Sequence, residues 1–144
     1  MDKKQSAVET FHNNFHCSQS VFAVFAEELG LDRETALKIA GCFGGGMRCG
    51  EVCGAVTGAL MAIGLKYGHC KPEDSAAKAD ADQKACLFME QFKQKNKSIL
   101  CRELLGHDLS LPEQRKAAAE QGLFATVCPK LVEDAVDIAQ NIIG

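Results

Sequence analysis

The sequence lacks the features that mark several specialised classes of protein. It has no tryptophan, one tyrosine and three prolines, and its net charge is only −3. It therefore offers no excess of basic residues for binding nucleic acid. The uncharged run at residues 52–65 is too short to cross a bilayer, and the first five residues lead into no apolar stretch of the signal-peptide kind. We expect a cytoplasmic protein that neither enters a membrane nor binds nucleic acid.

The cysteine motifs of common redox and metal proteins are also absent. No Cys-x-x-Cys pair occurs, which disfavours a thioredoxin-like dithiol and a zinc ribbon. The standard ferredoxin spacings are missing. Without a Cys-x-x-Cys-His motif, no attached haem is expected. Any cysteine site must therefore be assembled from distant parts of the chain.

What the sequence does contain is many cysteines and a clear helical periodicity. Eight of its 144 residues are cysteine, and 47% of its residues are apolar. In a reducing compartment, so many cysteines favour metal or redox chemistry over structural disulfides. Apolar residues recur at helical spacing, and strand patterns are almost absent. We predict a single all-α domain over residues 1–144, a compact bundle of six to seven short helices.

A glycine- and alanine-rich helix is predicted at residues 49–67 as the centre of this bundle. Gly54 and Gly58 share one of its faces. Because glycine inside a helix costs roughly 1 kcal/mol against alanine, we expect this face to meet another helix or a cofactor closely. Cys49 and Cys53 lie one turn apart on the same predicted helix. Cys53 falls in its first turn, where free N–H groups and the helix dipole favour a thiolate.

Four cysteines fall at the predicted starts of four different helices. Asn14 and Ser98 are expected to cap two of these helices, and Pro129 is expected to begin the last one. The four residues are Cys17, Cys53, Cys101 and Cys128. Thiolates at four helix starts could converge on one point. That arrangement suits an iron–sulfur cluster, a bound metal or reactive thiol pairs.

The stretch Cys-Gly-Ala-Val-Thr-Gly at residues 53–58 resembles the Cys-Gly-Ala-x-x-Gly signature of the C_GCAxxG_C_C family of redox-active proteins. Family members are about the size of this chain and carry four characteristic cysteines. The resemblance covers nearly the whole length and selects the same four helix-start cysteines. It implies a redox-active protein. Related sequence also occurs in split-Soret cytochrome c, which carries an iron–sulfur cluster beside its haems.

Three interpretations of the site stay open. In the first, the four helix-start cysteines hold a [2Fe–2S] cluster or another metal for electron transfer or redox sensing, and Gly54 and Gly58 let the cofactor approach. In the second, metal-free thiols cycle between dithiol and disulfide, with Cys53 as the attacking thiolate and Cys49 as a resolving thiol. Both imply a redox partner protein. In the third, the protein is a non-redox interaction module, and the Gly54/Gly58 face forms the helix–helix contact of a homodimer.

Overall fold

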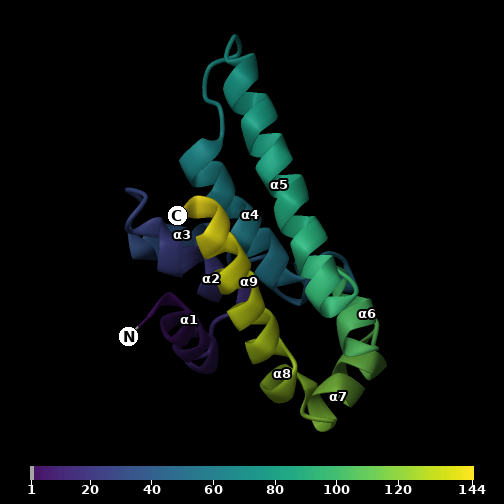
Figure 1. Ribbon diagram of the computed structural model, residues 1–144. Helices are drawn as coiled ribbons and strands as arrows, with labels where there is room; N and C mark the ends of the chain where they lie inside the picture. The colour runs from purple at the N-terminus through teal and green to yellow at the C-terminus, as the bar shows by residue number, and fades with distance from the viewer. Residues whose placement is uncertain (1) are drawn as a thin grey trace.

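Helices make up most of the computed structural model, which describes residues 2–144 (Figure 1). Helices α1 to α9 of the described chain are, in order, Lys3–His12, Cys17–Ala26, Arg33–Ile39, Gly54–Tyr67, Ser75–Asn96, Cys101–Leu105, Pro112–Glu120, Leu123–Thr126 and Cys128–Ile143. The predicted all-α class is confirmed. There are more helices than the six to seven predicted, because a helix as short as α8 leaves little periodicity in the sequence. No helix of the described residues is long and apolar enough to cross a bilayer.

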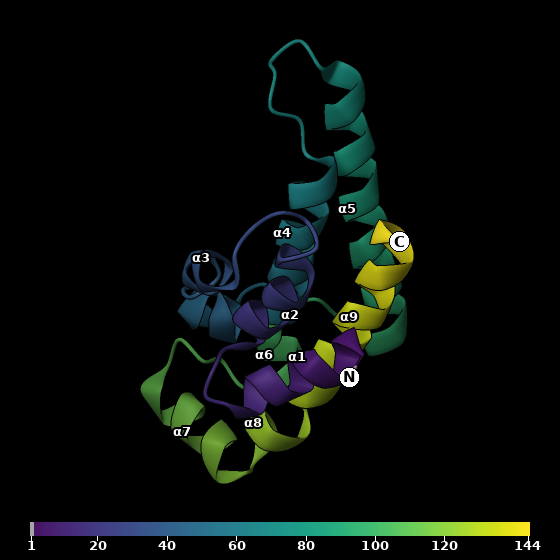
Figure 2. The ribbon, with the colours of Figure 1, turned by 90° about the vertical axis from the view of Figure 1, so that its left-hand side faces the viewer.

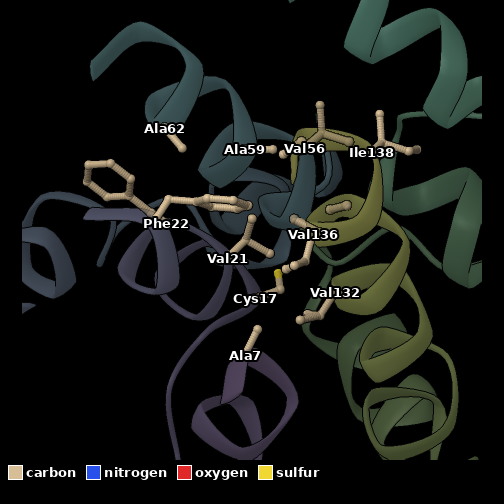
Figure 3. Packing of buried hydrophobic residues seen from close by; sticks show 14 of the residues in the cluster. Ala7, Cys17, Val21, Phe22, Val56, Ala59, Ala62, Val132, Val136 and Ile138 are labelled. Carbon is tan, nitrogen blue, oxygen red and sulfur yellow. The ribbon is translucent and has the colours of Figure 1, made fainter. Parts of the chain in front are cut away.

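Helix α4 lies at the centre of the fold, as the sequence predicts. Helices α2, α5 and α9 all pack against it. Together α4 and α5 form a helical hairpin whose loop projects from the rest of the molecule (Figure 2). The larger core cluster joins side chains of α2, α4 and α9. Figure 3 shows Cys17 of α2 among its members, near Val132 and Val136 of α9.

The glycine face of α4 is filled by α2 of the same chain. A Cβ atom added at Gly58 would lie 2.5 Å from the carbonyl oxygen of Ser18. Only glycine allows the two backbones to come this close. This contact explains the helix-breaking residue in the middle of α4. The Gly54/Gly58 face is therefore not available to a second copy, which corrects its assignment as a dimer contact; a homodimer through another surface stays a prediction.

The start of the central helix differs from the prediction. Helix α4 begins at Gly54, with Cys53 as its N-cap, and the preceding segment Gly46–Gly50 forms a π-helical turn. Met47 and Arg48 in this turn have left-handed backbone angles. Cys49 and Cys53 are therefore not one turn apart on a helix. Consecutive glycines at residues 44–46 make this turn possible, and nothing in the local periodicity indicates it.

Two predicted caps are also corrected. Helix α2 is capped by His16, whereas Asn14 lies in the preceding loop with a φ of +72°. The N-cap of α6 is Leu100, and the Ser98 hydroxyl accepts a hydrogen bond from its N–H at 2.9 Å. Each helix thus begins slightly later than predicted. Cys17 and Cys101 become the first residues of their helices.

Candidate functional site

Four cysteines from four helices line one cavity of about 320 Å³. Each is the first residue of a helix or its N-cap, and each is buried. They are the four helix-start cysteines of the sequence, Cys17, Cys53, Cys101 and Cys128. The structure thus brings together thiols that are up to 111 positions apart in the chain (17 and 128).

The isolated bridge between Val52 and Leu100 sets two of these cysteines side by side. The Cys53 N–H donates to the Ile99 carbonyl at 2.7 Å, and the Cys101 N–H donates to the Glu51 carbonyl at 2.7 Å. These bonds satisfy two backbone donors at the starts of α4 and α6, which have no partner within their own helices. They also fix the separation of the two thiols through the backbone.

Close packing of α2 on α4 brings Cys17 to the same place. A Cβ atom added at Gly54 would lie 2.5 Å from the Cys17 Sγ and 3.1 Å from the Ser18 backbone nitrogen. The glycine that follows Cys53 in the chain therefore leaves the space that the Cys17 sulfur fills. Any side chain at this position would push Cys17 away from Cys53.

Cys128 reaches the cavity from the start of α9, where Pro129 stands in the first turn. It packs with Cys101, Leu105 and Leu109 in the smaller of the two core clusters. Cys17 and Cys53 belong to the larger cluster. The cavity is therefore lined by two cysteines from each cluster.

The thiols of Cys17 and Cys53 are electrostatically coupled. A hydrogen bond from Cys53 lowers the pKa of Cys17 to about 7, against the opposing effect of burial, and the backbone N–H groups of Gly45 and Ser18 add to the lowering. The same hydrogen bond, together with burial, raises the pKa of Cys53 well above its usual value. The thiolate therefore lies on Cys17, whereas the sequence analysis expected it on Cys53.

The other two cavity thiols are protonated at neutral pH. Burial raises the pKa of Cys101 to about 12, and burial likewise raises the pKa of Cys128 to about 12. The nearby Cys17 sulfur adds to both shifts, because a second negative charge in the same cavity is unfavourable. Cys17 is therefore the one cavity thiol that ionises near neutral pH, and the other three stay protonated there.

The rest of the cavity wall is apolar and cationic. Phenylalanine and leucine side chains form much of it, and Arg48, Arg115, His16 and Asn14 contribute the polar groups. None of the described residues that line it is an aspartate or a glutamate. The two arginines could not be identified from the sequence, because no motif or periodicity distinguishes them from solvated surface cations.

The remaining candidates lie elsewhere. Gly54 lines the cavity and Gly58 does not. Cys49 is exposed, and its thiol donates to the Gly46 carbonyl at 3.4 Å. It is not among the cavity-lining residues, and the same holds for the three other exposed cysteines, Cys42, Cys70 and Cys86. All eight cysteines are free thiols.

The four thiols surround the cavity and do not meet at one point. Among residues 2–144, no three histidine, cysteine, aspartate or glutamate side chains are placed to hold a single metal ion. A tetrahedral zinc site needs four ligand atoms within about 2.3 Å of one centre. The arrangement is thus better matched to a group that spans the cavity or to chemistry between neighbouring thiols.

Comparison with known proteins identifies one family. The family model described as "Putative redox-active protein (C_GCAxxG_C_C)" matches residues 15–142. This match includes all four cavity cysteines and the Cys-Gly-Ala-Val-Thr-Gly stretch at residues 53–58. No curated protein and no solved structure matches the chain.

Proposed function

The chain belongs to the C_GCAxxG_C_C family of redox-active proteins, and we propose that its four cavity cysteines bind an iron–sulfur cluster, most simply [2Fe–2S]. The observation that carries this proposal is that four buried thiols line one cavity of about 320 Å³, which no aspartate or glutamate of residues 2–144 lines. Four cysteine thiolates are the usual ligands of such clusters. A bound cluster supplies reversible one-electron transfer between a donor and an acceptor protein.

The spacing of the thiols supports a group with two metal ions. The Cys17 and Cys53 side chains interact directly, and the Cys17 Sγ lies against Gly54, the residue that follows Cys53, which suits two ligands of one iron. Cys101 and Cys128 belong to the other core cluster, which suits ligation of the second iron. A single ion at the centre would require all four thiols to approach one point, and they do not.

The chain also stabilises negative charge in the cavity. Helices α2 and α9 begin at Cys17 and Cys128, and Cys53 is the N-cap of α4, so the N-terminal backbone dipoles of these helices favour thiolates. Arg48 and Arg115 line the same space. Iron binding replaces the protons of Cys53, Cys101 and Cys128, since metal ligation requires the deprotonated thiol.

A pair of serine variants tests the proposal. Cys53→Ser removes one ligand, so protein purified without oxygen should lose its visible absorbance and most of its iron. Cys86→Ser is the matched control, because Cys86 is exposed and outside the cavity, and it should keep both. An unchanged visible spectrum in Cys53→Ser would refute the cluster proposal.

The contact between Cys17 and Cys53 favours a second candidate, a metal-free dithiol. The Cys17 thiolate, whose pKa is about 7, would attack a disulfide of a partner protein and form a mixed disulfide. The first leaving sulfur takes the Cys53 proton, and Cys53 then attacks Cys17 and releases the second partner sulfur. Two electrons pass from the pair to the partner disulfide.

Mass spectrometry of metal-free protein treated with oxidised glutathione separates this candidate from the first. A dithiol protein should form a Cys17–Cys53 disulfide selectively. Oxidation confined to the exposed cysteines would count against it.

A further inference from the structure

Four consecutive residues beside the cavity have left-handed backbone angles. The φ values of Gly45, Gly46, Met47 and Arg48 are +64°, +63°, +59° and +62°. Glycine adopts this conformation freely, whereas Met47 and Arg48 adopt it at a cost in free energy. Strained backbone of this kind persists only where the surrounding structure imposes it, and it concentrates at functional sites.

Tight packing holds the turn in place. The Glu51 N–H donates to the Gly46 carbonyl at 3.0 Å. A Cβ atom added at Gly46 would lie 2.5 Å from the Glu51 nitrogen and 2.9 Å from the Cys101 Cβ. The turn is thus pressed directly against one of the cavity cysteines, with no space for a side chain between them.

The strained turn places Arg48 at the cavity. Arg48 lines the cavity, and its Nη1 would lie 3.1 Å from a Cβ atom added at Gly45. The guanidinium therefore lies over Gly45, which also lines the cavity. No salt bridge within the described residues involves Arg48, although the nearby Arg102 is paired with Glu51 at 2.9 Å.

Arg48 contributes its charge to the cavity wall. Arginine keeps its charge at every accessible pH. The cavity therefore carries a permanent positive charge that no carboxylate of the described residues neutralises.

We propose that Arg48 is a positioning residue whose guanidinium, held at the cavity by the strained left-handed turn, stabilises the reduced form of the iron–sulfur centre and raises its reduction potential. This inference rests on the proposed cluster. The reduced centre carries one more negative charge than the oxidised one. A fixed cation in a low-dielectric cavity therefore favours the reduced form more strongly.

Two glycine variants separate the charge from the strain. Met47→Gly and Arg48→Gly both remove a left-handed non-glycine residue, but only Arg48→Gly also removes a cation from the cavity wall. In metal-free protein, both variants should melt at or above the temperature of the wild type, because the strained backbone is relieved. A clear fall in the melting temperature of Arg48→Gly alone would give Arg48 a structural role and overturn the inference.

The decisive readout is the reduction potential of the cluster-loaded protein. Arg48→Gln should weaken the preference for the reduced form about tenfold, which corresponds to a shift of about 59 mV toward more negative potential. Arg48→Lys keeps the charge and should shift the potential less. Met47→Gly, and Arg33→Gln at an arginine outside the cavity, should leave it unchanged.

The possible failures are distinguishable. If the wild-type protein holds iron and sulfide but Arg48→Gln has the wild-type potential, the role of Arg48 is refuted and the cluster stands. If the wild-type protein holds no cluster, the proposed function is refuted, and this inference, which depends on the cluster, is refuted as well.

Discussion

A methyl group added at Gly58 tests whether α2 and α4 are in backbone contact, which is what brings Cys17 to the cavity. The added Cβ would lie 2.5 Å from the Ser18 carbonyl oxygen. Ordinary van der Waals contact begins near 3.4 Å, so the helices must separate by roughly 1 Å. Overpacking of this kind costs about 1–3 kcal/mol.

Gly64→Ala is the matched control on the same helix. Gly64 is exposed, and nothing lies within 4 Å of its added Cβ. This variant should gain the full helix propensity of alanine, about 1 kcal/mol. Gly58→Ala gains the same propensity and loses it again to the clash. The two variants should therefore differ in their free energy of unfolding by about 1–3 kcal/mol.

Urea denaturation of the metal-free protein, followed by far-UV circular dichroism, measures this difference. In thermal unfolding each kcal/mol corresponds to about 2–4 °C for a chain of this size. Equal stabilisation by Gly58→Ala and Gly64→Ala would mean that α2 and α4 do not meet at Gly58. The placement of Cys17 beside Cys53 would then be wrong.

Three further predictions concern charge and protons. Asp134 is buried, which acts to raise its pKa, but the hydrogen bond from Lys130 and the ion pair with Lys95 lower it. Its stabilising effect is present above the usual aspartate pKa of about 3.9 and is lost as the pH falls through the lowered value. Asp134→Asn should therefore lower the free energy of unfolding by about 1–2 kcal/mol at pH 7. The difference in stability from the wild type should become smaller as the pH is lowered in acid denaturation. An equal loss of stability at pH 7 and pH 3 would contradict this prediction. In metal-free protein, the rate at which iodoacetamide alkylates Cys17 should rise as the pH passes through 7. Cys101 and Cys128, with pKa values of about 12, should stay unmodified there. Peptide mass spectrometry measures the labelling of each cysteine, and equal labelling of all three would refute this prediction. Because cluster assembly displaces thiol protons, iron retention against a chelator should weaken as the pH is lowered from 8 to 6, and a pH-independent retention would speak against ligation by these thiols.

The sequence was sufficient to predict the fold class and a helix start near each cavity cysteine, although three of these helices begin a few residues later than predicted. Apolar spacing indicated helices throughout, and Pro129 marked the start of α9, where Cys128 is the first residue. The four cysteines were selected because helix starts were predicted near all of them. Helix caps and apolar periodicity depend on residues close together in the chain, so the sequence alone is enough to indicate them.

The parts that could not be predicted depend on contacts between distant residues. The bridge between Val52 and Leu100 joins segments 48 positions apart (52 and 100), and no short motif encodes it. The pKa of Cys17 depends on Cys53 and on the Gly45 N–H, both far away in the chain. Arg48 lies at the cavity because of a left-handed turn. The sequence there continues the helical pattern of the following helix, so it gives no sign of this turn.

The Gly54/Gly58 face shows how one pattern fits two structures. Small residues on a helix indicate close approach of another backbone, but they do not specify whether that backbone belongs to the same chain. Here Ser18 of α2 fills the face. The close approach was predicted correctly, and its assignment to a second copy was wrong.

Analysis of iron and acid-labile sulfide in protein purified without oxygen, together with its visible spectrum, tests the central claim most directly. That claim is that Cys17, Cys53, Cys101 and Cys128 form one cluster-binding redox centre. We predict about two iron and two sulfide per chain and the charge-transfer absorbance of thiolate-ligated iron. A colourless protein without iron, recovered with all four thiols intact, would contradict it.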